Sequence, residues 1–441
     1  MQILEQTWQV FLITFSQGKS SVSYILVLVP FVLFLELPLY FVSWMGVFRH
    51  IIKETFETPL ILPHFPRITC AIICYSEGKA VQNTVISLLE QIYPGHIEIM
   101  AVVDGVHKNQ ATYQALKALE PLFLSYPRRS LVIIPKTQRG GRVSSMNAGL
   151  SRASGEVYLA LDGDTSFDNQ MVYQAALHFQ NVDVVAVTGP MRVRNAQKSW
   201  ITRLQSLEYM LTMQVGKLGL AKFNVINNVP GAFGIFRKSF LQQVGGWNTG
   251  TAEDLDLTLR IKQYKGRYSQ LQIDFEPGAV SHTDVPESFS EFFMQRLRWD
   301  GDLLYIYANK HSKGISASIM GWRNFIFLLW YGILFQAVMP FAIVIYMIYM
   351  SVILPLPFFL AVMLLIYFFY LLLTFIQFTL YLAVVSDRKW EDCRAFLILP
   401  IFPLFQFVVR IWSAVAISNQ IFNKGHLDSA MAPWWVLKKG K

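Results

Sequence analysis

A short acidic motif is the clearest place in the chain where side chains can do chemistry. Asp162-Gly163-Asp164 directly follows an apolar run at residues 157–161. Two carboxylates one residue apart at the end of a buried strand suit Mg²⁺ or Mn²⁺, because such ions in nucleotide sites take one or two carboxylates plus phosphate oxygens. Asp and Gly also dominate tight turns for conformational reasons. The tripeptide alone therefore leaves a metal site and a plain turn open.

Further polar residues follow other strand-like runs. Tyr75 and Glu77 come after residues 68–74, in position to pack against a base and fix its orientation. Asp104 comes after residues 97–103, where a carboxylate can accept the N3–H of a uracil. Together these residues predict a pocket for a nucleotide.

Two later motifs have both a structural and a chemical interpretation. Glu253-Asp254 opens a helical stretch, where acids either cap the first turn or supply a general base within about 3 Å of an acceptor hydroxyl. The run Gln295-Arg296-Leu297-Arg298-Trp299 is either an amphipathic helix with snorkelling arginines or a site where guanidinium binds diphosphate and indole supports a sugar ring. Neither motif decides between its two interpretations.

The elements that must hold these residues predict an α/β domain. Strand-like runs alternate with helical stretches at residues 68–74, 97–103, 131–134, 157–161 and 184–188. Such alternation predicts a mostly parallel sheet that binds ligands outside the carboxyl ends of its strands. Most of the polar residues singled out above fall at those ends.

Composition places this domain in a membrane protein. Of the 441 residues, 53% are apolar and 15% charged, against roughly 45–50% and about 25% in soluble domains. This excludes a disordered chain, a coiled coil and a wholly soluble enzyme. The net charge of +9 fits loops that face anionic lipid and a phosphate-bearing substrate. No nucleic-acid partner is expected, because no basic run with interleaved aromatics occurs. The three cysteines are expected to be reduced packing residues.

Apolar runs flank the α/β domain on both sides. Residues 21–48, 325–350 and 358–385 each exceed the roughly 20 residues that a spanning helix needs. The first run carries one acid, Glu36, and the run 395–417 contains Pro400, Pro403 and Arg410, so two or three spans are expected after the domain. Aromatic residues of these later runs either stack on sugar rings or anchor the helices in the membrane, namely Trp322, Trp330, Tyr331 and Phe335.

These runs divide the chain into five parts. The predicted parts are an N-terminal segment with one transmembrane helix (1–50), a catalytic domain (51–285), amphipathic interface helices (286–322), transmembrane helices (323–420) and a basic tail (421–441). Residues 200–218 and 288–307 have the apolar spacing of helices that lie on a membrane or pack as ordinary surface helices. Basic residues after the first run place the domain in the cytoplasm by the positive-inside rule.

The order of the motifs resembles the membrane-integrated, processive family-2 glycosyltransferases, such as the cellulose, hyaluronan, chitin-oligosaccharide and poly-N-acetylglucosamine synthases. The similarity covers residues 66–302 and rests on five motifs in one order. It implies a GT-A-like, mostly parallel sheet domain inserted between transmembrane helices, with amphipathic interface helices. It also implies a multi-pass protein of the plasma (inner) membrane with a cytoplasmic catalytic domain.

The resemblance assigns a role to each matching residue. It implies nucleotide binding by Tyr75, Glu77, Asp104, Arg142 and Asp162, and metal binding by Asp164 and Asp162. It implies a general base at Asp254 with Glu253 beside it. It implies that acceptor and diphosphate contact Gln295, Arg298, Trp299, Gly231 and Phe233.

The chain departs from the family pattern at three positions. Val106 follows Asp104-Gly105 where a serine is usual, which puts the nucleotide contacts there in doubt. Arg142 replaces a common lysine, and Ala252 replaces a threonine before Glu253. None of these changes removes a charged group that the chemistry needs, so activity is expected.

The implied function is an inverting transfer from a UDP-sugar to a growing β-linked exopolysaccharide, with export of the product. The implied partners are the UDP-sugar, the polysaccharide acceptor, the lipid bilayer and accessory export proteins. One alternative is a single-sugar glycolipid synthase similar to ceramide glucosyltransferase. Another is a non-catalytic receptor or export subunit on a transferase scaffold.

Overall fold

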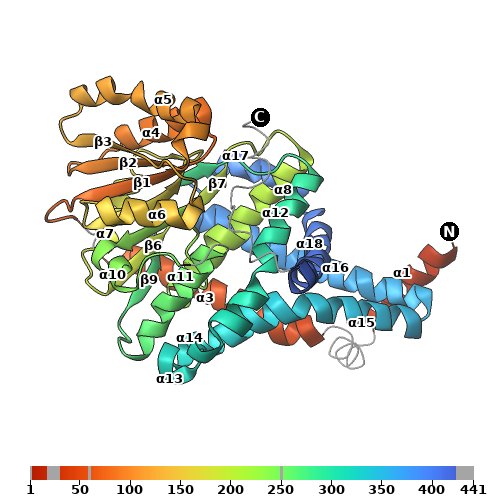
Figure 1. Cartoon of the computed structure of the whole chain (residues 1–441). Helices are drawn as coiled ribbons and strands as arrows, with labels where there is room; N and C mark the ends of the chain where they lie inside the picture. Colours follow the sequence, from red (N-terminus) through yellow and green to blue (C-terminus); the bar gives the residue numbers. More distant parts are fainter. Residues whose placement is uncertain (1, 17–29, 58–60, 249–251, 424–441) are drawn as a thin grey trace.

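The computed structural model describes residues 2–16, 30–57, 61–248 and 252–423. It has a sheet-containing domain at one end and long helices that project from it (Figure 1). The predicted basic tail lies almost wholly outside the described residues, as do residues 21–29 of the first predicted apolar run.

A seven-stranded sheet organises the domain, in the order β3-β2-β1-β4-β8-β6-β9. Its strands are β1 (Ile68–Cys74), β2 (Ile97–Val103), β3 (Arg129–Pro135), β4 (Val157–Asp162), β6 (Val184–Thr188), β8 (Phe233–Arg237) and β9 (Gln272–Phe275). Strands β3, β2, β1 and β4 are parallel, and β8 pairs antiparallel with both β4 and β6. This confirms the predicted mostly parallel sheet, although sequence analysis missed β8 and β9.

The register of the sheet gathers the motifs at one edge. Cys74 pairs with Val103, and Ile73 pairs with Asp162, so β1, β2 and β4 end at the same edge of the sheet. Antiparallel β8 begins at that edge, because Leu161 pairs with Phe233. Residues that follow β1, β2 and β4 therefore meet residues that precede β8.

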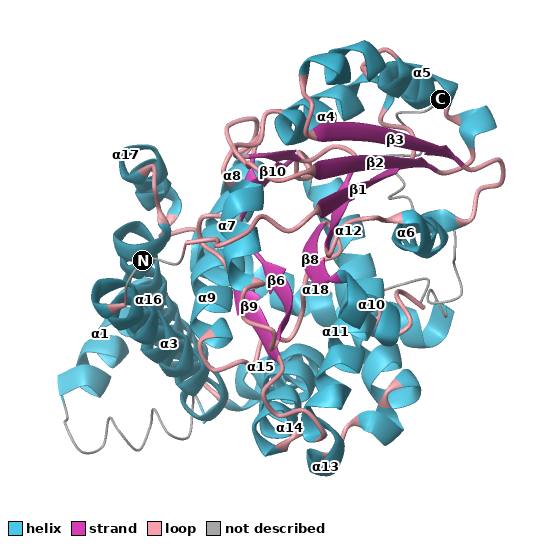
Figure 2. Cartoon of the chain, turned by 90° about the vertical axis from the view of Figure 1, so that its left-hand side faces the viewer, coloured by secondary structure: helices cyan, strands magenta, loops and turns pink. Residues whose placement is uncertain are grey.

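The two faces of the sheet carry separate hydrophobic cores, because side chains alternate along each strand. Cys70 and Ile72 face a core that includes residues of α4 (Val81–Leu89), α5 (Gln110–Lys117) and α7 (Met171–His178). Ala71 and Ile73 face a core that includes residues of α6 (Gly141–Arg152), α10 (Lys238–Gln243) and α11 (Glu253–Gln263). Figure 2 shows α4 and α6 on opposite sides of the strands.

The cysteines are all unpaired thiols. Cys70 and Cys74 lie buried in β1, as expected for packing residues. Cys393 is exposed, so the expectation that it packs in the interior was wrong. It falls in a short 3₁₀ segment, Cys393–Ile398, that precedes the last long helix and in which most residues are exposed.

Amphipathic helices connect the sheet to the long helices. The first is continuous through α8 (Trp200–Glu208), π-helical turns (Tyr209–Gly216) and α9 (Lys217–Ala221). The second is α12 (Phe289–Gly301), which carries the Gln295-to-Trp299 motif. A small sheet lies beside them, in the order β5-β10-β7, with strands β5 (Ser166–Phe167), β7 (Met191–Val193) and β10 (Ser281–Thr283).

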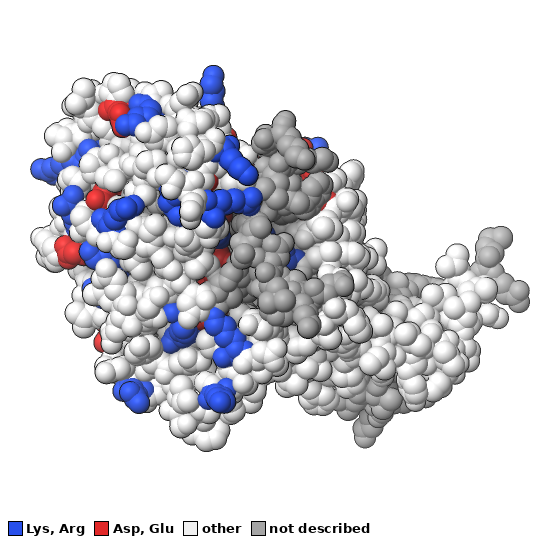
Figure 3. All heavy atoms as spheres, in the orientation of Figure 1, with Lys and Arg blue, Asp and Glu red and all other residues white. Residues whose placement is uncertain are grey.

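Four helices of the described chain are long and apolar enough to cross a membrane: Val32–Phe56, Trp322–Ile353, Leu356–Val385 and Phe402–Phe422. They contain α3 (Leu37–Phe56), α14 (Trp322–Phe327), α15 (Met339–Ile353), α16 (Leu356–Leu380) and α18 (Phe402–Asn423). Pro403 falls in the first turn of α18, where proline is tolerated. The helices α15 and α16 show no charged side chain on the face drawn in Figure 3, whereas Lys and Arg gather over the sheet domain.

An N-terminal helix, α1 (Gln2–Ser16), packs along α16. Sequence analysis did not predict it. Its exposed apolar side chains include Ile3, Leu4 and Trp8. These residues extend the apolar surface of the projecting helices.

Helices α3 and α9 touch through glycines. A Cβ added to Gly46 would lie 1.9 Å from the carbonyl oxygen of Gly219, and one added to Gly219 would lie 2.2 Å from that of Ser43. Close backbone approach of this kind requires residues without side chains. The amphipathic helix is therefore seated directly on the first long apolar helix.

Candidate active site

A cavity of about 1010 Å³ opens at the edge of the sheet where the motifs meet. All but one of the residues predicted for the site line it: Tyr75, Glu77, Asp104, Arg142, Asp162, Asp164, Gly231, Glu253, Asp254, Gln295, Arg298 and Trp299. Residues that follow β1 and β2 thus converge on one space with residues of β4, α6, α11 and α12, although they are spread over more than half of the chain.

Arg142 connects two of the motifs. Its Nε donates to Glu253 Oε1 at 2.6 Å, and its Nη1 pairs with Asp162 Oδ1. Burial would lower the pKa of Arg142, but the two acids raise it well above its usual value. Burial raises the pKa of Glu253, which the positive charge of Arg142 opposes. A fixed guanidinium therefore holds the end of β4 against the start of α11.

Acidic side chains form the floor of the cavity near β4. Burial and the charges of Asp164 and Asp162 raise the pKa of Glu77 to about 7. The side chain of Asp164 faces the cavity. Burial by the surrounding protein and the charge of Asp162 raise the pKa of its carboxyl to about 6. Raised pKa values of neighbouring carboxyls mark a place where a positive charge is favoured.

A divalent cation fits this acidic floor. Within the described residues, no three acidic, histidine or cysteine side chains converge closely enough to hold an ion by themselves. Asp162 shares one oxygen with Arg142, whereas the carboxylate of Asp164 faces the cavity. One or two carboxylates completed by phosphate oxygens is the donor set that Mg²⁺ takes in nucleotide sites.

Asp104 and Tyr75 form the far wall of the cavity. The Asp104 carboxylate accepts hydrogen bonds from the backbone N–H groups of Gly140 and Gly141, both at 2.9 Å, and from Lys136 Nζ at 2.7 Å. It therefore fixes the start of α6, which carries Arg142. The guanidinium of Arg139 lies 4.2 Å from the centre of the Tyr75 ring.

Asp254 is oriented by the loop before β8. Its Oδ2 accepts hydrogen bonds from Asn228 Nδ2 at 3.1 Å and from Gly231 N at 3.3 Å. Its Oδ1 accepts one from Leu255 N at 2.8 Å, so it satisfies an N–H group in the first turn of α11, whose N-cap is Ala252. Asp254 therefore stabilises the start of the helix and also lines the cavity. A Cβ at position 231 would lie 2.8 Å from Glu253 Oε1, which explains a glycine there.

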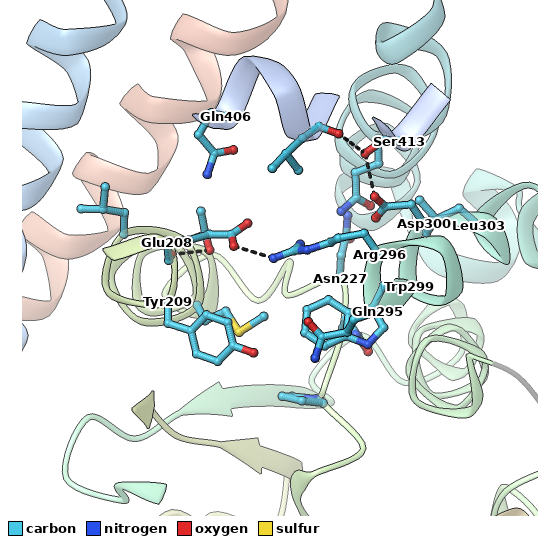
Figure 4. A pocket seen from close by; sticks show the side chains of 18 of the residues that line it. Glu208, Tyr209, Asn227, Gln295, Arg296, Trp299, Asp300, Leu303, Gln406 and Ser413 are labelled. Carbon is cyan, nitrogen blue, oxygen red and sulfur yellow. Dashed lines mark hydrogen bonds and ion pairs between the residues drawn. The ribbon is translucent and has the colours of Figure 1, made fainter. Parts of the chain in front are cut away.

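The motif on α12 forms the opposite wall, seen in Figure 4. Gln295 is buried, and its Oε1 has no hydrogen-bond partner among the described residues. Arg296 pairs with Glu208 at 2.5 Å and lies 4.8 Å from the centre of the Trp299 ring. Burial lowers the pKa of Arg298, while Glu253 raises it. Arg296 thus has a structural role, whereas Arg298 faces the acidic floor.

Phe233 is the predicted residue that does not line the cavity. It is fully buried at the start of β8, and its ring packs 5.7 Å from that of Phe167. In this structure it supports the loop that contains Gly231 rather than the cavity wall.

Lys217 lines the cavity and was missed by sequence analysis. Burial lowers its pKa to about 8, while Asp254 raises it. The available signal was a lysine between Gly216 and Gly219, in the apolar C-terminal part of an amphipathic helix. Sequence analysis considered only the apolar spacing of that helix and therefore did not single out Lys217.

The cavity continues between the long apolar helices. There its lining includes Tyr40, Tyr331, Phe335, Gln336, Tyr370, Gln377, Gln406 and Arg410. Of the aromatic residues singled out in the sequence, Tyr331 and Phe335 line it. Trp322 is mostly exposed, and Trp330 donates to the carbonyl oxygen of Leu35, so these two serve the helices instead.

Comparisons with known proteins identify glycosyltransferase families over most of the sheet domain. Residues 69–245 match the family described as glycosyl transferase family 2, and residues 158–373 match glycosyl transferase family group 2. A poly-beta-1,6-N-acetyl-D-glucosamine synthase of Staphylococcus epidermidis is 29% identical over 234 residues, which is 53% of each chain. An N-acetylglucosaminyltransferase of Mesorhizobium japonicum is 26% identical over 53% of this chain and 55% of that protein. The chain thus matches about half the length of these curated relatives.

A solved structure shares the fold. The mannosyltransferase PcManGT from Pyrobaculum calidifontis, in complex with GDP-Man and Mn²⁺, superimposes with a TM-score of 0.56 at 16% identity. The match covers 88% of this chain and 96% of that one. It therefore extends beyond the sheet domain into the helices around it.

Proposed function

Because the chain belongs to the family-2 glycosyltransferases, we propose that it polymerises a sugar from a UDP-sugar donor into a β-linked polysaccharide. The polymer then leaves through the part of the cavity between the apolar helices. The catalytic domain faces the cytoplasm in this proposal, and accessory export proteins receive the product.

The observation that carries the proposal is the continuity of the cavity. One space reaches from Asp162 and Asp254 to Tyr331, Phe335 and Tyr370 among the long helices. A hydrophilic polymer must cross roughly 30 Å of hydrocarbon, which only a lined passage allows. A catalytic site that opens into such a passage supports synthesis coupled to export.

The donor binds at the acidic floor. Asp164 and Asp162 would hold a divalent cation, which supplies positive charge to the diphosphate when it is bound. Arg298 faces the same space from α12 and can bind the diphosphate by two parallel hydrogen bonds. Tyr75, Asp104 and Glu77 surround the uridine. Charge fixed in advance around the leaving group is usually the largest catalytic contribution.

The acceptor enters from the side of the apolar helices. Asp254, held by Asn228 and Gly231, takes the proton from the acceptor hydroxyl as that oxygen attacks the sugar. Trp299 offers a surface for the end of the glycan, and Gln295 Oε1, which has no hydrogen-bond partner in the described part of the chain, offers an acceptor. Attack from the side opposite the diphosphate inverts the configuration at the anomeric carbon.

A glycolipid synthase is the second candidate, because the cavity between the helices also suits an acyl chain. Against it stand the polar residues there, which include Gln336, Gln377, Gln406 and Arg410. Acyl chains gain nothing from such groups, whereas sugar hydroxyls bond to them. A non-catalytic scaffold is disfavoured by the complete set of acids.

The test is a product assay on the purified full chain in nanodiscs. We expect UDP release with one member of a panel of UDP-sugars and a polymer that is retained on a gel. A single-sugar lipid extracted into chloroform would favour the second candidate. No UDP release with any donor would contradict both enzymatic proposals.

A further inference from the structure

Two charged residues lie within apolar stretches of the long helices. Glu36 is the single acid in the first apolar run, and Arg410 lies in the last long helix, α18. Ionisable residues at membrane depth are costly to place, and they face a protein interior or a water-filled space where they usually serve function. The steps proposed for donor binding and transfer use neither residue, and Arg410 has so far counted only as one of several polar residues in the cavity wall.

The structure brings these two residues together in the cavity wall. Arg410 Nη2 lies 3.4 Å from Glu36 Oε2. Both residues line the cavity, and the Glu36 side chain is 1% exposed. Among the described residues, no hydrogen bond reaches the other carboxylate oxygen, Oε1. The carboxylate therefore keeps an unused acceptor beside the cavity.

The surroundings of the pair are those of a carbohydrate site. The Arg410 guanidinium lies 4.1 Å from the centre of the Phe335 ring, and Tyr40 and Tyr370 line the cavity with it. Aromatic faces pack on sugar rings, while carboxylate and guanidinium groups accept from and donate to hydroxyls. At 3.4 Å the ion pair is longer than an ordinary N–H···O hydrogen bond, and the Arg410 side chain is 21% exposed, so its guanidinium can meet a ligand in the cavity.

Helix α18 also links this pair to the acceptor motif. Ser413, three residues after Arg410, donates from Oγ to Asp300 Oδ2 at 2.6 Å, and Asp300 directly follows Trp299 on α12. The Trp412 indole N–H donates to the carbonyl oxygen of Phe293 at 2.9 Å. The pair is therefore fixed to the same two-helix unit that presents the acceptor motif.

We propose that Glu36 and Arg410 form a glycan-binding subsite within the membrane-spanning part of the cavity. The inference rests on the proposed polysaccharide synthesis. Hydroxyls of the passing polymer bond to the two charged groups, while Phe335 and the tyrosines pack on its rings. When no glycan is present, the two groups pair with each other and keep the passage closed to ions. The subsite retains the product between additions and so sets its length.

Three variants test the subsite in the full chain in nanodiscs, with the donor found active in the product assay. Glu36→Gln and Arg410→Gln remove one charge each, and Arg410→Lys keeps the charge but loses the planar fork. Glu54→Gln, on the same helix and outside the cavity lining, is the matched control. The measurements are mean product length, the rate of UDP release on a short primer, and the melting temperature.

We expect product length to fall about tenfold in all three variants, because one hydrogen bond to a charged group is worth at least about 1.5 kcal/mol. The rate of UDP release should fall by less than the length does, and the control should match the wild type in both. Wild-type product length in Arg410→Lys would overturn the subsite, because an ion pair that only staples helices tolerates lysine. Equal losses in length and rate would overturn it as well.

The product lengths of the glutamine variants are interpreted together with their melting temperatures, which report whether each variant folds. If they lose melting temperature, Arg410→Lys alone decides, because it keeps the pairing charge. A wild-type protein that makes no polymer refutes the proposed function, whereas wild-type polymer with unchanged variants refutes only the subsite.

Discussion

Arg142 Nε donates a hydrogen bond to Glu253 Oε1 at 2.6 Å, although the two residues are 111 positions apart in the chain. The same guanidinium pairs with Asp162, so it joins the proposed metal motif to the helix that carries the proposed base. Removing one member of a buried ion pair leaves the other charge unpaired, at a cost of about 3–5 kcal/mol. The position of Asp254 relative to the donor therefore depends on Arg142.

Arg142→Met is expected to lower turnover by at least about a hundredfold, the effect typical of losing one fixed electrostatic group. Arg142→Lys should lose less, because it keeps the charge but cannot reach both acids with the same geometry. UDP release measures both. Arg152→Met, on the exposed end of the same helix, is the control and should behave as wild type. Full activity in Arg142→Met would contradict the role of the bridge.

Asp254→Asn should reduce polymer formation about 10²–10⁴-fold, because the amide cannot take the acceptor proton. UDP binding, measured by calorimetry, should be retained, since the donor contacts other residues. Turnover equal to that of the wild type would refute the assignment of the base.

Asp164→Asn should weaken metal-dependent UDP binding, because the amide lacks the negative charge that favours a divalent cation. Calorimetric titration of UDP with and without Mn²⁺ separates this effect from loss of nucleotide contacts. Asp183→Asn, at a half-buried position outside the cavity lining, is the control. Wild-type affinity in the presence of Mn²⁺ would count against Asp164 as a ligand.

Gly219→Ala should destabilise the protein by about 1–3 kcal/mol, because the new methyl group would meet the Ser43 carbonyl oxygen at 2.2 Å. Gly216→Ala is the matched control, since its Cβ meets its nearest neighbour at 3.4 Å, an ordinary contact. The melting temperatures of the two variants should therefore differ. Equal values would mean that α3 and α9 can separate without loss.

Stability should also depend on pH through His178. Burial would lower its pKa, but hydrogen bonds to Asp274 and Glu276 raise it from 6.5 to about 9. A raised folded-state pKa stabilises the protein fully below about pH 6.5 and loses that contribution as pH rises through 9. The shift corresponds to roughly 3 kcal/mol. His178→Gln should flatten the melting temperature between pH 6.5 and 9.5; an unchanged slope would contradict this origin.

The apolar patterns of the sequence predicted where several strands of the sheet begin and end, but not how all of its strands pair. The boundaries of β1, β2 and β6 agree with the apolar runs at 68–74, 97–103 and 184–188. Strand β8 was missed because Phe233–Arg237 is only five residues long, carries a glycine and directly follows another glycine-containing stretch. Its antiparallel pairing with β4 is a long-range choice that no local pattern encodes.

The sequence predicted which residues belong to the site, but not their hydrogen-bond and ion-pair partners. Asp104 lines the cavity, as expected of a residue near a base, but its hydrogen bonds to the start of α6 and to Lys136 were not predicted. The lowered pKa of Lys217 results from its burial near Asp254, and this burial depends on how α9 packs. Glu36 and Arg410 were visible as single charges in apolar runs, and only the folded chain pairs them.

The contact between Gly46 and Gly219 has a practical consequence for anyone who wishes to isolate the transferase half. One continuous core joins Ile73 and Met100 of the sheet to Val47 of the first apolar helix and Phe378 and Phe405 of later ones. A fragment that contains only the sheet domain would expose the hydrophobic surface that packs against the long helices, and it would aggregate in buffer. Soluble truncations are therefore a poor route to crystals or assays, and detergent or lipid must accompany the enzyme from the first extraction step.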